Sequence, residues 1–106
     1  MTTYTHIRDN DEGFTVTLKS NGGRLNTAGV TKVEVEIGNT TFDSTVDTTV
    51  VSVNDVGDVE LTLGNSVPAG TYNVIMSVFD NASTLGTVVV HPKLPDANLK
   101  LIVKEK

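Results

Sequence analysis

The fold of this chain is decided by residues 67–80, Val67-Pro-Ala-Gly-Thr-Tyr-Asn-Val-Ile-Met-Ser-Val-Phe-Asp80. The proline and the glycine near its start interrupt any preceding strand, because proline fixes φ and lacks an N–H, and glycine tolerates unusual φ values. From Tyr72 to Val78 an apolar residue then recurs at every second position, which places these side chains on one face of an extended strand. A tyrosine that opens a strand after such a turn predicts a tyrosine corner, in which the ring packs in a β-sandwich core and the hydroxyl bonds to upstream backbone.

The rest of the chain repeats this alternation in short segments separated by turns. Valine occurs 17 times and threonine 16 times, and both β-branched residue types favour strands over helices. Short strands with turn signals every eight to twelve residues predict an immunoglobulin-like antiparallel β-sandwich of about seven to nine strands, formed by residues 1–106 as a single domain. We expect its core to include Phe14, Val16, Leu18, Val33, Val35, Ile37, Val59, Leu61, Leu63, Tyr72, Val74, Met76 and Val78.

Charge is distributed unevenly along the chain, which carries a net charge of −5. Between Val33 and Pro92 there are eight acidic residues and no lysine or arginine. Binding to nucleic acid requires a basic surface that displaces counterions from phosphates, so we expect no nucleic-acid partner and no anionic membrane partner. The first residues show no apolar segment of signal-peptide length, and we expect no signal peptide.

Residues suited to catalysis are scarce. His6 and His91 are the two histidines, and cysteine is absent. There is no Gly-x-Ser-x-Gly nucleophile motif, no glycine-rich phosphate loop, and no third ligand at a spacing that would complete a zinc site with the histidines. We therefore expect no enzyme activity, no cofactor and no small-molecule substrate.

A cluster of acidic residues near the N-terminus has two interpretations. Asp9, Asp11 and Glu12 supply closely spaced oxygen ligands of the kind that calcium prefers. Asp and Asn also favour tight turns without any metal, and the cluster lacks the glycine and terminal glutamate spacing of an EF-hand loop. We favour the turn and keep calcium as the alternative.

The second face of the long strand suggests an interface. If Tyr72 and its period-two partners point inward, Ile75 and Phe79 point outward, where large apolar side chains are unusual. Three consecutive valines at 88–90 likewise cannot all point inward in a regular strand. We predict a protein–protein interface that includes Ile75, Phe79 and Val89, with cover by another segment of the same chain as the alternative.

Several of these segments resemble a phage module. Phe14-Thr-Val-Thr-Leu18, Asn21-Gly-Gly23 and Leu25-Asn-Thr-Ala-Gly-Val-Thr-Lys-Val-Glu-Val35 are similar to the opening of the immunoglobulin-like N-terminal module of baseplate upper proteins, and of related phage tail and virion proteins. The Gly70-Thr-Tyr72 strand resembles a late strand of the same group. The similarity spans about residues 13–91, and the further domains of baseplate proteins have no counterpart in this sequence.

The resemblance implies a non-enzymatic phage or prophage structural protein of tail, baseplate or capsid-surface type. Such a protein would be assembled into virions in the host cytoplasm and would contact other virion proteins and copies of itself. The alternative is an immunoglobulin-like module that binds carbohydrate or a host surface through its loops. Against this alternative, the chain has no tryptophan and only five aromatic residues.

Overall fold

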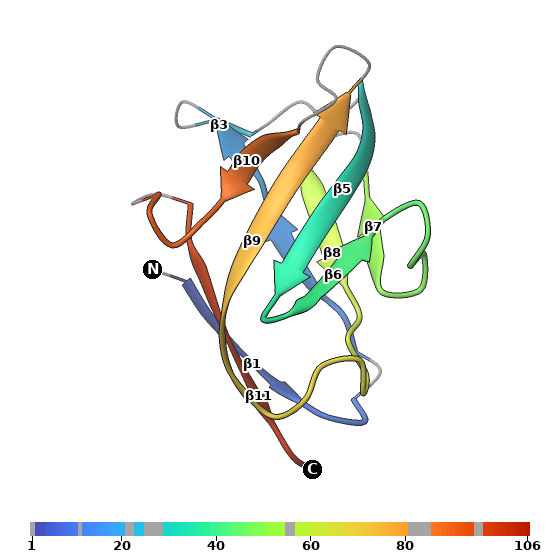
Figure 1. Ribbon diagram of the computed structural model, residues 1–106, viewed down its shortest axis with the longest axis vertical. Helices are drawn as coiled ribbons and strands as arrows, with labels where there is room; N and C mark the ends of the chain where they lie inside the picture. Colours follow the sequence, from blue (N-terminus) through green and yellow to red (C-terminus); the bar gives the residue numbers. More distant parts are fainter. Residues whose placement is uncertain are drawn as a thin grey trace.

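Two β-sheets face each other in a computed structural model that describes residues 2–10, 12–20, 23–24, 29–54, 57–80, 86–94 and 97–106. The larger sheet has six strands in the order β1-β11-β9-β5-β6, with β10 also beside β9, and the smaller has the order β2-β8-β7 (Figure 1). The strands are β1 (Thr2–Ile7), β2 (Phe14–Thr17), β3 (Lys19–Ser20), β4 (Gly23–Arg24), β5 (Val30–Ile37), β6 (Thr40–Asp43), β7 (Val51–Val53), β8 (Asp58–Leu61), β9 (Gly70–Asp80), β10 (Thr87–Val90) and β11 (Leu99–Lys104). The described residues contain no helix, and the expected immunoglobulin-like β-sandwich, with nine strands in its two main sheets, is confirmed.

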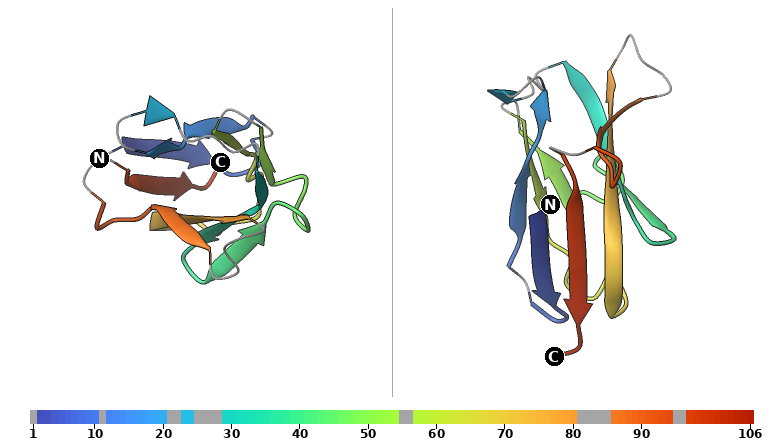
Figure 2. Two further views of the ribbon diagram at one scale, coloured as in Figure 1. Left: turned by 90° about the horizontal axis from the view of Figure 1, so that it is seen from above. Right: turned by 90° about the vertical axis from the view of Figure 1, so that its left-hand side faces the viewer.

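Strand β9 organises the larger sheet. One of its edges pairs with β5 along most of its length, so that Met76 lies opposite Val35. The other edge is shared, because β11 pairs with its first half and β10 with its second half. The described residues between these two strands, 91–94 and 97–98, belong to neither strand, and Figure 2 shows the larger sheet from two further sides. β10 and β11 therefore share one edge of β9.

One strand pairing differs from the expected antiparallel pattern. β1 pairs in parallel with β11, with Thr2 opposite Leu99 and Ile7 opposite Lys104. β1 therefore belongs to the larger sheet, whereas β2, which follows it in sequence, belongs to the smaller one. The chain crosses between the sheets within residues 8–13, and it crosses back between β8 and β9 at the same end of the sandwich (Figure 1).

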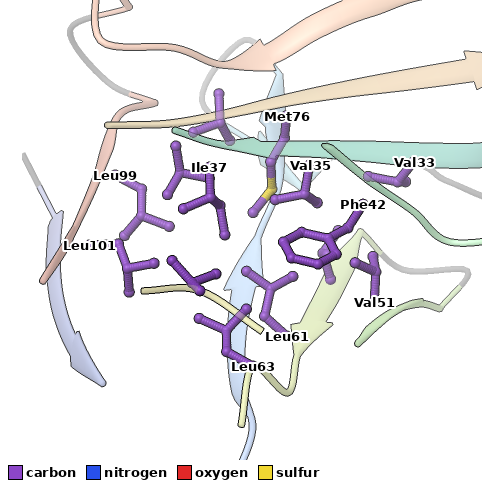
Figure 3. Packing of buried hydrophobic residues seen from close by; sticks show 14 of the residues in the cluster. Val33, Val35, Ile37, Phe42, Val51, Leu61, Leu63, Met76, Leu99 and Leu101 are labelled. Atoms are coloured by element: carbon purple, nitrogen blue, oxygen red, sulfur yellow. The ribbon is translucent and has the colours of Figure 1, made fainter. Parts of the chain in front are cut away.

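The core lies between the two sheets, and Figure 3 shows side chains from both meeting there. Nine of the expected core residues are buried, whereas Phe14, Val16, Tyr72 and Val78 are partly buried and pack against them. Leu101 and Val103 join this core from β11, and their alternation with Lys100, Ile102 and Lys104 follows the same period of two. The cluster comprises Leu18, Val33, Val35, Ile37, Phe42, Val51, Val59, Leu61, Leu63, Val67, Val74, Met76, Val89, Val90, Leu99, Leu101 and Val103.

The tyrosine corner is present as expected. The Tyr72 hydroxyl donates a hydrogen bond to the Pro68 carbonyl over 2.8 Å, four residues upstream. The ring of Tyr72 also packs against Gly38, where a Cβ would lie 2.9 Å from the ring atom Cε1. Gly38 has a φ of +62°, a conformation that glycine adopts without strain. The corner thus fastens the turn before β9 to the turn between β5 and β6.

Candidate functional site

A groove of about 380 Å³ lies between β1 and β2, beside the break between β10 and β11. The ring of Tyr4 from β1 stacks on the ring of Phe14 from β2, with their centroids 3.8 Å apart and their planes at 18°. This stacked pair connects the edges of the two sheets at one end of the groove. The lining residues are Thr2, Thr3, Tyr4, Phe14, Thr15, Val16, Thr17, Leu18, Val89, Val90, Ala97, Asn98 and Leu99.

The groove has an uncharged lining. It combines aliphatic and aromatic side chains with four threonines and one asparagine, and none of its described lining residues is acidic, basic or a histidine. Apolar surface favours burial, and hydroxyl and amide groups can exchange hydrogen bonds with a peptide or a sugar. The lining contains no group that titrates near neutral pH, so the arrangement suits binding of an uncharged segment and offers no acid–base pair.

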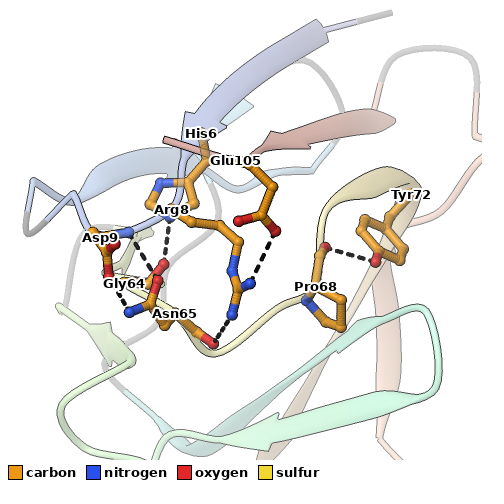
Figure 4. Close-up of polar contacts among 8 residues, drawn as sticks. All are labelled: His6, Arg8, Asp9, Gly64, Asn65, Pro68, Tyr72 and Glu105. Atoms are coloured by element: carbon orange, nitrogen blue, oxygen red, sulfur yellow. Dashed lines mark hydrogen bonds and ion pairs between the residues drawn. The ribbon is translucent and has the colours of Figure 1, made fainter.

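His6 is buried at the opposite end of β1, with 2% of its surface exposed. Its Nε2 lies 2.8 Å from the Gly64 carbonyl oxygen (Figure 4). A carbonyl oxygen can only accept, so Nε2 carries the proton and donates it to Gly64. His91 is engaged locally, because its Nδ1 accepts the Lys93 N–H over 3.0 Å. Both histidines therefore bond to backbone, which is a structural arrangement.

The polar contacts around Gly64 form a cluster at the end of β1, which Figure 4 shows together with the tyrosine corner. Arg8 forms an ion pair with Glu105 over 3.0 Å and donates from its other terminal nitrogen to the Asn65 carbonyl over 3.2 Å. Asn65 accepts the Asp9 N–H over 2.9 Å through its side-chain oxygen and donates its amide to the Asp9 carboxylate. We call His6, Arg8, Asp9, Gly64 and Asn65 the β1 anchor.

The candidate calcium ligands lie in and beside this anchor. Asp9 uses its carboxylate as an acceptor for Asn65, and the Asn10 side chain accepts the Glu12 N–H over 3.0 Å, as in an Asx turn. Asp11 lies outside the described residues. Within the described part of the chain, no three acidic, histidine or cysteine residues gather as a metal site. The turn interpretation accounts for these contacts, and calcium binding stays untested.

The expected interface residues separate into two groups. Ile75 and Phe79 are partly buried on the outer face of β9. The Lys32 ammonium lies 4.6 Å from the centroid of the Phe79 ring, and a Cβ at Gly86 would lie 2.7 Å from that ring. The chain's own residues thus cover part of Phe79, and its role in an interface stays a prediction.

Val89 is not on the surface, which corrects its place in the expected interface. It is 9% exposed and belongs to the core cluster, whereas the preceding residue, Val88, is 48% exposed. The pairing of β10 with β9 shifts register between Val88 and Val90. Such a bulge lets two consecutive side chains point inward, which strict alternation forbids.

Charged side chains gather on the outer face of the larger sheet. Lys32 lies 3.1 Å from Glu34 and 3.6 Å from Asp43, and the hydrogen bond with Glu34 leads the causes that raise the pKa of Lys32 above its usual 10.5. The pKa of Asp43 is lowered below 3.8, because its carboxylate accepts hydrogen bonds from the Thr45 hydroxyl and backbone N–H. This face therefore stays charged across the neutral range, unlike the groove.

Sequence reasoning missed the groove and the burial of His6. The sequence contained one signal for the groove, which is the absence of charged residues from 2–7 and from 14–18. Residues from both segments line the groove. No family model matches the chain, and no curated protein sequence is significantly similar to it. Among the described residues, no helix is long and apolar enough to cross a membrane.

Proposed function

We propose that this chain is a non-enzymatic structural protein of a phage or prophage, of tail, baseplate or capsid-surface type, that acts through protein–protein contacts. The observation that carries the protein–protein part is the uncharged groove between two sheet edges that have no strand beside them in the described structure. Exposed sheet edges and apolar grooves are surfaces that other proteins bind. The phage assignment rests on the resemblance of residues 13–91 to virion modules.

The mechanism that fits a domain of this size is repeated weak contact. A small interface between single domains gives low affinity, and an assembly that presents many copies converts it into a stable attachment. The partners would be other virion proteins and further copies of this chain. Its location would be the virion, after assembly in the host cytoplasm.

Particle composition tests this proposal. Prophage induction in a strain that carries the gene, gradient purification of the released particles and peptide mass spectrometry should find this chain in the particle fraction. A matched strain with the gene deleted should lack those peptides. If intact particles contain none of the chain while it accumulates outside them, the virion assignment is wrong.

Carbohydrate binding is the second candidate function. The lining of the groove makes the groove the candidate site for it. Tyr4 and Phe14 provide rings, and the neighbouring threonines provide hydroxyl groups. The two rings stack on each other, which covers one face of each ring. A glycan array probed with the wild type and with Thr2→Lys tests this. Binding that the lysine removes supports a sugar site in the groove, and no binding by the wild type rejects it.

A further inference from the structure

The free edges of the two sheets differ in length and charge. In the described structure three strands of the larger sheet have an unpaired edge, namely β1, β6 and β10, and two strands of the smaller sheet do, namely β2 and β7. β1 has six residues, whereas the other four have four or fewer. Edge strands in monomeric proteins are usually short, charged, bulged or interrupted by proline, which prevents pairing with another chain. β1 has none of these features, because its sequence is TTYTHI and its register with β11 is regular.

Every second residue of β1 directs its backbone N–H and C=O groups toward the unpaired edge of the strand. Thr2 donates its N–H to Asn98 and Arg8 donates to Lys104, so even-numbered residues bond toward β11. In a parallel pair the intervening residues direct their N–H and C=O groups away from the partner. Thr3, Thr5 and Ile7 therefore face outward. The Ile7 carbonyl already accepts the Asn10 N–H over 3.2 Å, but a carbonyl oxygen can accept a second hydrogen bond.

We propose that two copies of this chain associate by antiparallel pairing of β1 with β1, with Thr5 of one copy opposite Thr5 of the other. This register keeps the paired stretch from Thr3 to Ile7 within the strand. It brings the outward groups of Thr3 opposite those of Ile7, and those of Thr5 opposite themselves. The resulting interface is symmetric, since each copy contributes the same surface.

The absence of charge makes the β1 edge the place where a second copy of this acidic chain is repelled least. Two chains that each carry a net charge of −5 repel, and like charges directly opposite each other in a sheet are destabilising. The β1 edge avoids this, because in the proposed register threonine meets threonine, threonine meets isoleucine, and Tyr4 meets His6. Of the other two edge strands of this sheet, β6 ends in Asp43 and β10 has only four residues. At the end of β1, Arg8 is paired with Glu105 of its own chain.

Apolar exposure points to the same edge. Ile7 is 39% exposed and is one of three large hydrophobic residues identified as exposed in the described structure. Opposite Thr3 of a second copy it would form a pair of β-branched side chains, which suits a sheet. The paired stretch is short, so we expect a weak dimer with a dissociation constant of about 10 µM to 1 mM. The inference rests on the protein–protein part of the proposed function and does not depend on the virion assignment.

Charge substitutions test the pairing by sedimentation equilibrium. The wild type should change from monomer to dimer as its concentration rises to about 1 mM. Thr5→Lys and Thr5→Glu should each weaken association at least about tenfold, because like charges then lie opposite each other, and an equimolar mixture of the two variants should restore it. Thr41→Lys, the matched control on the β6 edge, should associate like the wild type.

Cysteine substitutions test the register. The chain has no cysteine, so each variant carries a single thiol. Thr5→Cys should form a disulfide-linked dimer on mild oxidation, because directly opposite residues in a sheet have Cα atoms about 5.5 Å apart. Thr3→Cys should not, because its copies would lie about 13 Å apart along the strands.

Three results would overturn the inference. They are a wild type that stays monomeric to about 1 mM, a mixture of charge variants that fails to associate, and cross-linking of Thr3→Cys as fast as Thr5→Cys. A monomer would exclude self-pairing while leaving the particle composition experiment to decide the virion role. Thermal unfolding of each variant is the control, and a melting temperature equal to that of the wild type shows that the strand pairing inside the chain is intact.

Discussion

The two ends of β1 are held in different ways. At its C-terminal end, the β1 anchor joins the strand to the Gly64–Asn65 turn through hydrogen bonds to backbone, and the tyrosine corner lies in the same connection. At its N-terminal end, Thr2, Thr3 and Tyr4 line the groove, and the contact across to β2 is the stacking of Tyr4 on Phe14. Two connections cross between the sheets beside the anchor, where the buried His6 side chain has a hydrogen-bond partner in the Gly64 carbonyl. The anchor end therefore provides stability, and the groove end leaves surface for binding.

Among the substitutions at the two ends of β1, removal of the His6 side chain should cause the largest loss of stability. His6→Ala leaves a cavity and an unpaired Gly64 carbonyl, so we expect a loss of about 2–4 kcal/mol in the free energy of unfolding. Urea denaturation followed by circular dichroism measures it. His91→Ala is the control, with an expected change within about 0.5 kcal/mol, since His91 bonds within its own turn. A loss below about 1 kcal/mol for His6→Ala would show that the anchor is not the stable end.

Gly38→Ala tests the packing around the tyrosine corner. The added Cβ meets the Tyr72 ring and the backbone has a positive φ, so we expect a loss of about 1–3 kcal/mol. Gly29→Ala is the matched control, because a Cβ at Gly29 would have nothing within 4 Å. The two variants should differ clearly in melting temperature, and equal values would contradict the role assigned to the Gly38–Tyr72 contact.

Tyr72→Phe removes only the hydroxyl of the tyrosine corner. Loss of the bond to the Pro68 carbonyl should lower the free energy of unfolding by about 1–2 kcal/mol. Tyr4→Phe at the groove keeps the ring that stacks on Phe14, and its stability should change by about 0.5 kcal/mol or less. If the two tyrosine variants lose the same amount, the distinction between the two ends of β1 fails.

Thr2→Lys should have the smallest effect on stability. Thr2 is exposed and lines the groove, so the free energy of unfolding should change by no more than about 0.5 kcal/mol. Calorimetry of the purified variant measures this. A larger loss would mean that the groove contributes to the closure of the sandwich and is not simply a binding surface.

The site was less predictable than the fold for a physical reason. Alternation and turn chemistry are local, so they identified the strand faces of β5, β8 and β9 from a few consecutive residues each. The groove is formed by segments that are far apart in sequence, and the absence of charge from residues 2–7 and 14–18 does not show that these segments become neighbours. The interface prediction failed at Val89 for a related reason, because a bulge in one strand depends on its partner.

The sequence by itself determined the all-β class, most of the core and the tyrosine corner. A proline, a glycine and a tyrosine at fixed spacing set the corner, and the period of two set which side chains point inward. Only the tertiary structure decided the parallel pairing of β1 with β11, the burial of His6 against a carbonyl 58 residues away, and the position of β1 at an edge of the described sheet. These depend on which strands become neighbours, and that choice is made by the packing of the whole core rather than by any one segment.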